Sequence, residues 1–114
     1  MCQLPAEARV PEWALGGSLL SVTRTADELS IVCEESRVPA DVRSEKDWVA
    51  LKMEGPFPFA MTGVLASFIG PLAVAGVSIF SVSTFDTDYV LVKRAQLEVA
   101  IQALAAAGHM VTAG

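Results

Sequence analysis

The chain has 114 residues, enough for one compact domain or for two small units that share a core. Hydrophobic residues make up 53% of it and charged residues only 18%, a composition that excludes an intrinsically disordered chain. The net charge is -5, and the eight Lys and Arg residues form no basic stripe. We therefore expect no nucleic-acid partner.

The first 47 residues predict a small β-rich unit. We expect an edge strand over residues 1–4, one turn of helix over residues 11–15, and a hairpin whose strands cover residues 18–24 and 28–34. Residues 36–47 are polar and contain Pro39, which predicts a connector with at most one helical turn. Cys2 and Cys33 have no metal-type spacing, and no secretory signal is evident. We expect plain thiols in a cytoplasmic protein.

Residues 48–114 predict the order strand, helix, strand, strand, helix, strand. The strands are expected over residues 48–53, 77–82, 89–92 and 109–111, and the helices over residues 63–75 and 94–107. Gly76 and Gly108 are expected to cap the two helices, and Pro71 to kink the first. The residues expected to face the core are Val64, Leu65, Phe68, Ile69, Leu72 and Ala75 in the first helix, and Leu97, Ile101 and Leu104 in the second.

No charged residue occurs between Gly55 and Phe85, a run long enough to resemble a membrane span. Prolines and glycines interrupt this run, and its periodicity changes from helical to strand-like after Gly76. We therefore predict a buried helix followed by a buried strand, and no membrane partner.

The sequence also contains an internal repeat, because residues 11–32 align without a gap with residues 71–92. The identical pairs include Gly16 with Gly76 and Val22 with Val82. Such self-similarity favours a duplicated supersecondary unit, although two unrelated hairpins can share the same pattern.

Ser83-Thr-Phe-Asp-Thr-Asp88 is the most distinctive stretch, an acidic turn between two β-branched runs. Asp86 and Asp88 would point to one face if both were extended, where they would hold an ammonium or guanidinium group. A helix that begins at Gly63 would offer free backbone N–H groups to a carboxylate. Each feature also has a structural interpretation, since the two acids can be turn formers and Phe85 can belong to the core.

The helix start Gly63-Val-Leu-Ala-Ser67, together with residues 83–92, resembles the ACT domain family, in particular the subfamily that includes the cytosolic arginine sensor of animal cells. This resemblance implies an α+β, ferredoxin-like fold (βαββαβ) with an antiparallel sheet and helices on one face. The ACT domain would cover residues 48–114, in tandem with an abbreviated ACT-like unit over residues 1–47.

The resemblance also implies a ligand pocket between the start of the first helix and a hairpin. Backbone groups of Gly63 and Val64 would bind a ligand carboxylate, Thr84 and Phe85 would line the pocket, and Asp88 would meet a cationic group. The full predicted site is Met61, Thr62, Gly63, Val64, Leu65, Ser83, Thr84, Phe85, Asp86 and Asp88. Met61 stands where the arginine sensor has an acidic residue, which leaves an amino-acid-like ligand other than arginine open.

The sequence thus predicts an amino-acid-binding regulatory domain that acts as a homodimer through oligomeric interfaces. A structural or protein-interaction module without a working ligand site is the alternative. No nucleophile with a base, metal cluster or phosphate loop is apparent, so we expect neither an enzyme nor a cofactor.

Overall fold

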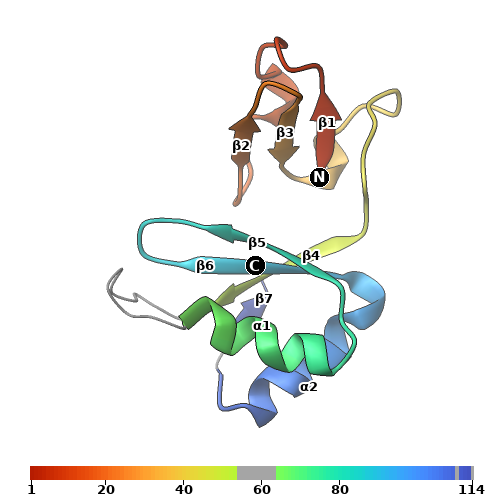
Figure 1. Ribbon diagram of the computed structural model, residues 1–114. Helices are drawn as coiled ribbons and strands as arrows, with labels where there is room; N and C mark the ends of the chain where they lie inside the picture. The colour runs from red at the N-terminus through yellow and green to blue at the C-terminus, as the bar shows by residue number, and fades with distance from the viewer. Residues whose placement is uncertain (54–63, 110, 114) are drawn as a thin grey trace. The chain divides into compact units, whose positions relative to one another are not determined.

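The computed structural model describes residues 1–53, 64–109 and 111–113, and it divides into two compact units, Met1–Asp47 (unit 1) and Trp48–Gly114 (unit 2). Each unit contains one antiparallel sheet (Figure 1). The strand order is β1-β3-β2 in unit 1 and β5-β6-β4-β7 in unit 2.

Unit 1 is built around a small apolar cluster on one sheet. Its elements are β1 (Cys2–Leu4), the 3-10 helix η1 (Glu12–Ala14), β2 (Ser21–Arg24), β3 (Leu29–Val32) and the 3-10 helix η2 (Glu35–Arg37). These confirm the predicted edge strand, helical turn and hairpin, although both hairpin strands are shorter than expected because their ladder ends at the Ser21–Val32 pair. The buried cluster consists of Cys2, Ala14, Leu29 and Ile31.

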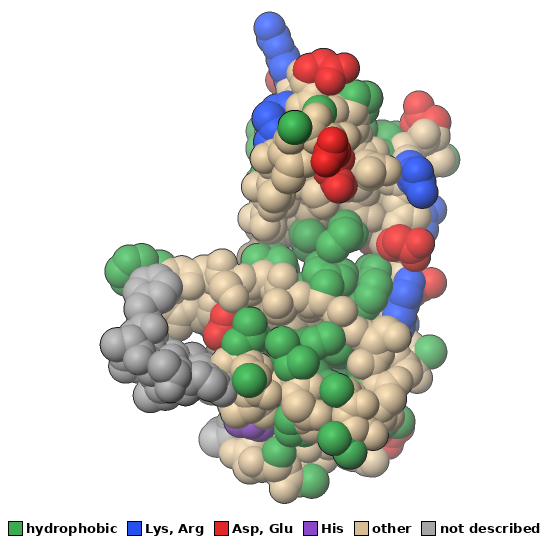
Figure 2. Space-filling model, viewed as in Figure 1, with side chains coloured by type: hydrophobic (Ala, Val, Ile, Leu, Met, Phe, Trp, Pro, Cys, Tyr) green, Lys and Arg blue, Asp and Glu red, His purple; other side chains and the backbone are tan. Residues whose placement is uncertain are grey.

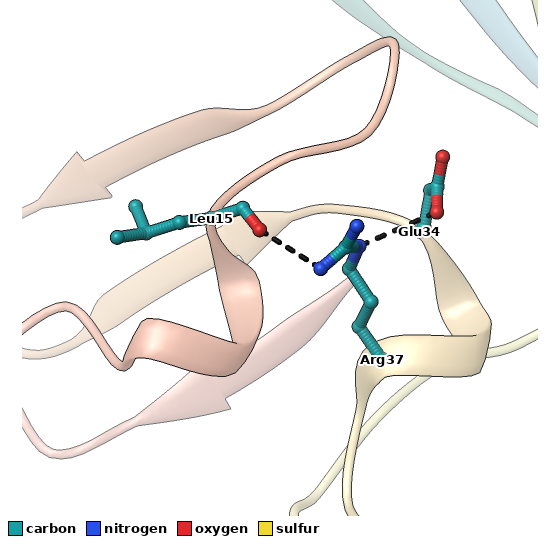
Figure 3. A network of polar contacts seen from close by, with 3 residues as sticks. All are labelled: Leu15, Glu34 and Arg37. Atoms are coloured by element: carbon teal, nitrogen blue, oxygen red, sulfur yellow. Dashed lines mark hydrogen bonds and ion pairs between the residues drawn. The ribbon is translucent and has the colours of Figure 1, made fainter.

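A hydrogen bond and an ion pair, both made by Arg37, connect the ends of the two 3-10 helices of unit 1 (Figure 3). Arg37 Nη1 donates to the Leu15 carbonyl at 3.0 Å, and Arg37 Nε lies 3.3 Å from Glu34 Oε2. The network passes close to Gly17, whose φ is +79° and where a Cβ atom would lie 2.8 Å from the Glu34 carboxyl carbon. The backbone conformation at position 17 therefore favours glycine, and a Cβ atom there would force the Glu34 side chain to move.

Cys2 and Cys33 are neighbours in unit 1, which their separation in sequence does not suggest. Both are free thiols, and Cys2 Sγ lies 3.6 Å from the Ile31 carbonyl oxygen. Burial raises the pKa of both thiols, and the adjacent Cys33 raises the pKa of Cys2 further. Both side chains therefore stay protonated at neutral pH, where they act as small apolar groups.

Unit 2 has two helices on one face of its sheet (Figure 1). Its elements are β4 (Trp48–Met53), α1 (Val64–Val74), β5 (Ile79–Ser83), β6 (Asp88–Lys93), the 3-10 helix η3 (Arg94–Gln96), α2 (Leu97–Ala106) and β7 (Val111–Ala113). Side chains from the strands, from both helices and from the connection between α1 and β5 form the core, namely Leu51, Met53, Phe68, Leu72, Val77, Val90, Val92, Ala100 and Leu104. This arrangement confirms the predicted ferredoxin-like order.

Several residues expected in this core lie outside it. Leu65 and Ile69 are half-buried and do not belong to the core cluster, and two others are exposed. Ala75 is exposed because α1 ends at Val74. Ile101 is 38% exposed, whereas Ala100 is fully buried. The inner stripe of α2 follows positions 97, 100 and 104, an i, i+3, i+7 spacing that directs Ile101 to the flank of the helix. The last strand begins at Val111 and not at position 109, because the backbone of His109 still bonds to α2.

Both helices of unit 2 end in the same hydrogen-bonded motif. After α1, Gly76 N–H donates to Ala73 at 3.1 Å and Val77 N–H to Leu72 at 3.0 Å. After α2, Gly108 N–H donates to Ala105 at 3.0 Å and His109 N–H to Leu104 at 2.9 Å. Both glycines have positive φ, so each helix has a Schellman C-cap. The predicted glycine caps are confirmed.

Helix α1 of unit 2 is unusually apolar. The segment Val64–Val74 contains no charged residue, and Val74 is 91% exposed. On the face shown in Figure 2, hydrophobic side chains gather over unit 2, while most of the visible charged side chains belong to unit 1. Within the ranges that the structure describes, no helix combines the length and apolar character needed to cross a bilayer.

The two units share one topology. In each, a first strand is followed by a helical segment and a hairpin, and the second hairpin strand lies between the first strand and the other hairpin strand. A 3-10 helix then follows in both. Unit 1 lacks counterparts of α2 and β7 within the described residues, and its assignment as an abbreviated ACT-like half stays a prediction.

The structural equivalence differs from the ungapped sequence alignment by one residue at the turns. Thr25 N–H donates to the Glu28 carbonyl at 2.9 Å, and Thr84 N–H donates to the Thr87 carbonyl at 2.8 Å. Thr25 therefore corresponds to Thr84, whereas the alignment placed it against Phe85. A shift of one residue along a strand moves side chains to the opposite face, so the alignment locates the hairpins but not their register.

Candidate ligand-binding site

The β5–β6 turn is stabilised by Thr84. Its backbone N–H and its hydroxyl both donate to the Thr87 carbonyl, at 2.8 and 2.9 Å. Its Oγ1 also accepts from the Thr87 N–H at 3.1 Å. A threonine that bonds backbone groups three residues ahead holds a tight turn closed. Thr84 therefore has a structural role in the turn, whether or not it also contacts a ligand.

Asp88 forms a specific side-chain pair with Ser83. The two residues face each other in the first rung of the ladder, and Ser83 Oγ donates to Asp88 Oδ1 at 2.6 Å. This distance is typical of a hydroxyl bonded to a carboxylate. A carboxylate offers about four acceptor positions, so Asp88 retains capacity for a cationic ligand group while Ser83 fixes its orientation.

The two predicted acids are not equivalent. Asp88 is half-buried and starts strand β6, whereas Asp86 is exposed and lies in the bend. The extended backbone that would direct both carboxylates to one face is therefore absent between them. Phe85 is 78% exposed, so the interpretation of Phe85 as a core residue is wrong. Asp88 is the better-oriented carboxylate of this turn.

The topology brings the start of α1 to the same end of the sheet as this turn. Lys52, near the end of β4, pairs with Tyr89, so β4 ends beside the turn. The four residues between α1 and β5 place the end of α1 near the start of β5, at the opposite end of the sheet. The 11-residue helix, about 16 Å long, therefore begins near the turn (Figure 1).

The predicted site is thus described only in part. Met61, Thr62 and Gly63 lie outside the described residues. Val64 is the first residue of α1 and Leu65 is half-buried. The described half contains Ser83, Thr84, Phe85, Asp86 and Asp88. In the structure Ser83 and Asp88 form a hydrogen-bonded pair, Thr84 closes the turn, and the side chains of Phe85 and Asp86 are exposed.

Two polar features of the structure were not found by sequence reasoning. The Ser83–Asp88 bond joins two residues of the predicted site, but the register that places them opposite each other is set by the turn and is not given by alternation along the strands. The contact between His109 and the Ser67 carbonyl joins residues far apart in sequence, and no local pattern indicates it. In the described part of the chain, no group of three or more His, Cys, Asp and Glu residues could hold a metal ion.

Comparison with known proteins assigns the chain to a family. A family model described as an ACT domain matches residues 43–106, and a second model, of an N-terminal domain, matches residues 1–41. The chain belongs to the ACT domain family.

Among its relatives is the cytosolic arginine sensor for mTORC1 subunit 1 of Bos taurus, 30% identical over 96 residues. This match covers 75% of the chain and 29% of the relative. Human CASTOR3P is 31% identical over 90 residues, with 68% of the chain and 55% of the relative covered. The chain therefore spans about half or less of the length of these curated relatives.

A solved structure matches over nearly the whole chain. The X-ray crystal structure of a protein from Agobacterium tumefaciens has a TM-score of 0.88 and 48% sequence identity, and the match covers 94% of this chain and 80% of that one. The fold seen here, including both units, is therefore that of a protein already observed by crystallography. The chain is an ACT domain protein related to the arginine sensor.

Proposed function

We propose that this protein is a regulatory module that binds an amino acid between the start of α1 and a β5–β6 turn, and that it acts in the cytoplasm as a homodimer. The observation that carries the proposal is the Ser83–Asp88 pair, held at 2.6 Å at the end of the sheet where α1 begins. The corresponding positions of unit 1 are Arg24 and Leu29, which cannot form such a pair. The ordered carboxylate is thus a property of the ACT unit and not of the hairpin in general.

The two parts of the proposed site, the start of α1 and Asp88, suit the oppositely charged groups of an amino acid. Backbone N–H groups at the start of α1, from Gly63 and Val64, would bind the ligand carboxylate, because a helix N-terminus carries unsatisfied donors and partial positive charge. Asp88 would bind an ammonium or guanidinium group. A charge-assisted hydrogen bond of this kind contributes about 1.5–3 kcal/mol.

The relatives support an amino-acid ligand, although their names do not identify the ligand of this chain. One of them is named as a cytosolic arginine sensor. Met61, which stands where the resemblance leads us to expect an acid, removes one charge that a guanidinium group would use. We therefore propose an amino acid and leave its side chain to be found by experiment.

The test is a thermal-shift screen of the purified chain against the twenty amino acids and a few polyamines. A ligand present at 100 times its dissociation constant should add about 2.7 kcal/mol of stability, which raises Tm by several degrees. Asp88→Asn should reduce this shift by about half or more, because the amide keeps an acceptor for Ser83 but removes the charge. We expect a Kd about tenfold to hundredfold weaker.

The matched control is Asp27→Asn, which removes a carboxylate from the corresponding turn of unit 1. It should leave the ligand-induced shift unchanged. An equal loss of shift in both variants would show that net charge and not a local site determines binding, and would contradict the proposed role of Asp88.

A protein-interaction module without a working ligand site is the second candidate. It is favoured by Phe85, whose large aromatic side chain is 78% exposed, since an exposed apolar surface can serve as a protein contact. If no amino acid or polyamine shifts Tm, this candidate replaces the first.

A further inference from the structure

Helix α1 contains a proline at a position that affects its hydrogen bonding. In a regular α-helix the carbonyl of residue 67 accepts from the N–H of residue 71. Position 71 is Pro71, which has no N–H, yet α1 continues from Val64 to Val74. Residue 71 therefore cannot donate to the Ser67 carbonyl as it would in a regular helix.

His109 places a ring nitrogen at this carbonyl. Its Nε2 lies 2.8 Å from the Ser67 oxygen, a normal hydrogen-bond distance. Its ring also packs edge-on against Phe68, with 4.4 Å between ring centroids and an interplanar angle of 66°. Because a carbonyl can only accept, Nε2 must carry the hydrogen. The contact therefore specifies which nitrogen of the neutral imidazole is protonated.

The backbone around His109 explains how the side chain reaches this point. Its N–H donates to Leu104 at 2.9 Å as the last bond of the α2 Schellman motif, and the preceding Gly108 has a φ of +88°. Leu104 is fully buried in the core of unit 2, and Phe68 of α1 is 3% exposed in the same core. The ring is thus held by the fixed end of one helix against the first half of the other.

We infer that His109 is a positioning residue whose Nε2–H supplies to α1 the donor that Pro71 cannot provide. By fixing the carbonyl of the first helical turn, His109 sets the direction of the α1 start, where the ligand carboxylate would bind. This second step rests on the proposed function, whereas the hydrogen bond itself does not. A bond between the end of α2 and the first half of α1 would thereby determine the geometry of the ligand site.

The first experiment reads the tautomer directly. His109 is the only histidine in the sequence, so its ring ¹⁵N signals in an NMR spectrum of the intact protein need no assignment by mutagenesis. At a pH where the ring is neutral, we expect Nε2 to be protonated and Nδ1 not. A neutral ring with its hydrogen on Nδ1 would overturn the inference.

The second experiment is a double-mutant cycle between positions 109 and 71. His109→Phe keeps an aromatic ring next to Phe68 but removes the donor, and Pro71→Ala restores a backbone N–H to the helix. With Pro71 in place, His109→Phe should reduce the folding equilibrium constant about fivefold to tenfold. In the Pro71→Ala background, the same change should reduce it less than about twofold, because residue 71 then donates to Ser67 itself. Equal losses in both backgrounds would mean that His109 acts by packing alone.

Ligand binding by the four proteins of this cycle (the wild type, the two single variants and the double variant) tests whether His109 positions the site or only stabilises the fold. Each is screened for thermal shifts with the twenty amino acids. If any amino acid binds, the His109→Phe single variant should bind it at least about fivefold more weakly, and the double variant should recover the affinity of Pro71→Ala alone. Equal affinity in all four proteins would overturn the positioning role. If no amino acid binds the wild-type chain, the proposed function fails together with that role. The stability cycle then still decides whether the bond exists, provided that the hydrogen is on Nε2.

Discussion

The two hairpins of this protein have the same turn but different flanking pairs. In each turn a threonine, Thr25 or Thr84, bonds backbone groups three residues ahead. In unit 1 the strand residue before the turn is Arg24, whose guanidinium donates to the carbonyls of Ala6 and Ala8. In unit 2 the same position is Ser83, which orients a carboxylate. The difference shows that the threonine belongs to the fold and that the flanking pair is where a function can reside.

The two units also differ in how much core they bury. The buried cluster of unit 2 uses both helices, whereas the cluster of unit 1 is small and includes a thiol and an alanine. A small core depends more heavily on each large side chain. Unit 1 relies in addition on the network around Arg37, which connects its two 3-10 helices.

The largest effect should follow from Leu29→Ala in unit 1. Leu29 is fully buried at the centre of the sheet, and its truncation should cost about 2–5 kcal/mol. Amide hydrogen exchange can locate the loss. We expect protection to fall for β2 and β3 while β4 and β6 keep theirs, because these strands belong to separate clusters. A simultaneous loss in both sheets would contradict separate stabilisation of the two units.

A smaller effect is expected from Gly17→Ala, with Gly76→Ala as its control. Both glycines have positive φ, which costs a non-glycine residue about 1–2 kcal/mol. Nothing lies within 4 Å of a Cβ at position 76, but at position 17 the Cβ would displace Glu34 from Arg37. Gly17→Ala should therefore cost about 1 kcal/mol more than Gly76→Ala, measured by urea unfolding. Equal costs would show that the network adds nothing.

Sequence reasoning predicts the elements and their order in this protein because its local signals are strong. β-branched runs bounded by polar turns identify the hairpins, and Gly76 and Gly108 mark the helix ends, since each adopts the positive φ that a Schellman cap requires. The burial of individual helix positions is harder to predict. The packing of neighbouring elements buries Ala100 and leaves Ile101 partly exposed. The periodicity of apolar residues along the helix contains no information about these neighbours.

The site is predicted less well for the same reason. Asp86 and Asp88 look alike in sequence, and only the position of the bend separates an exposed acid from one held by Ser83. The contact between His109 and Ser67 depends on the packing of α2 against α1. The sequence shows that Pro71 has no backbone N–H to donate, but it does not show which residue donates to the Ser67 carbonyl in its place.

The smallest effect compares the two turns directly, with Thr25→Val and Thr84→Val. Valine keeps the shape of threonine but removes the hydroxyl, so each variant loses side-chain bonds to the backbone of its own turn. Because both turns are exposed, we expect each change to cost only about 1 kcal/mol in urea unfolding. Ligand binding should separate the two. Thr84→Val should reduce the thermal shift produced by an amino acid, because it loosens the turn that presents Asp88, while Thr25→Val should leave that shift unchanged. If both variants bind the amino acid like the wild type, Ser83 alone orients Asp88, and the turn serves only to join β5 to β6.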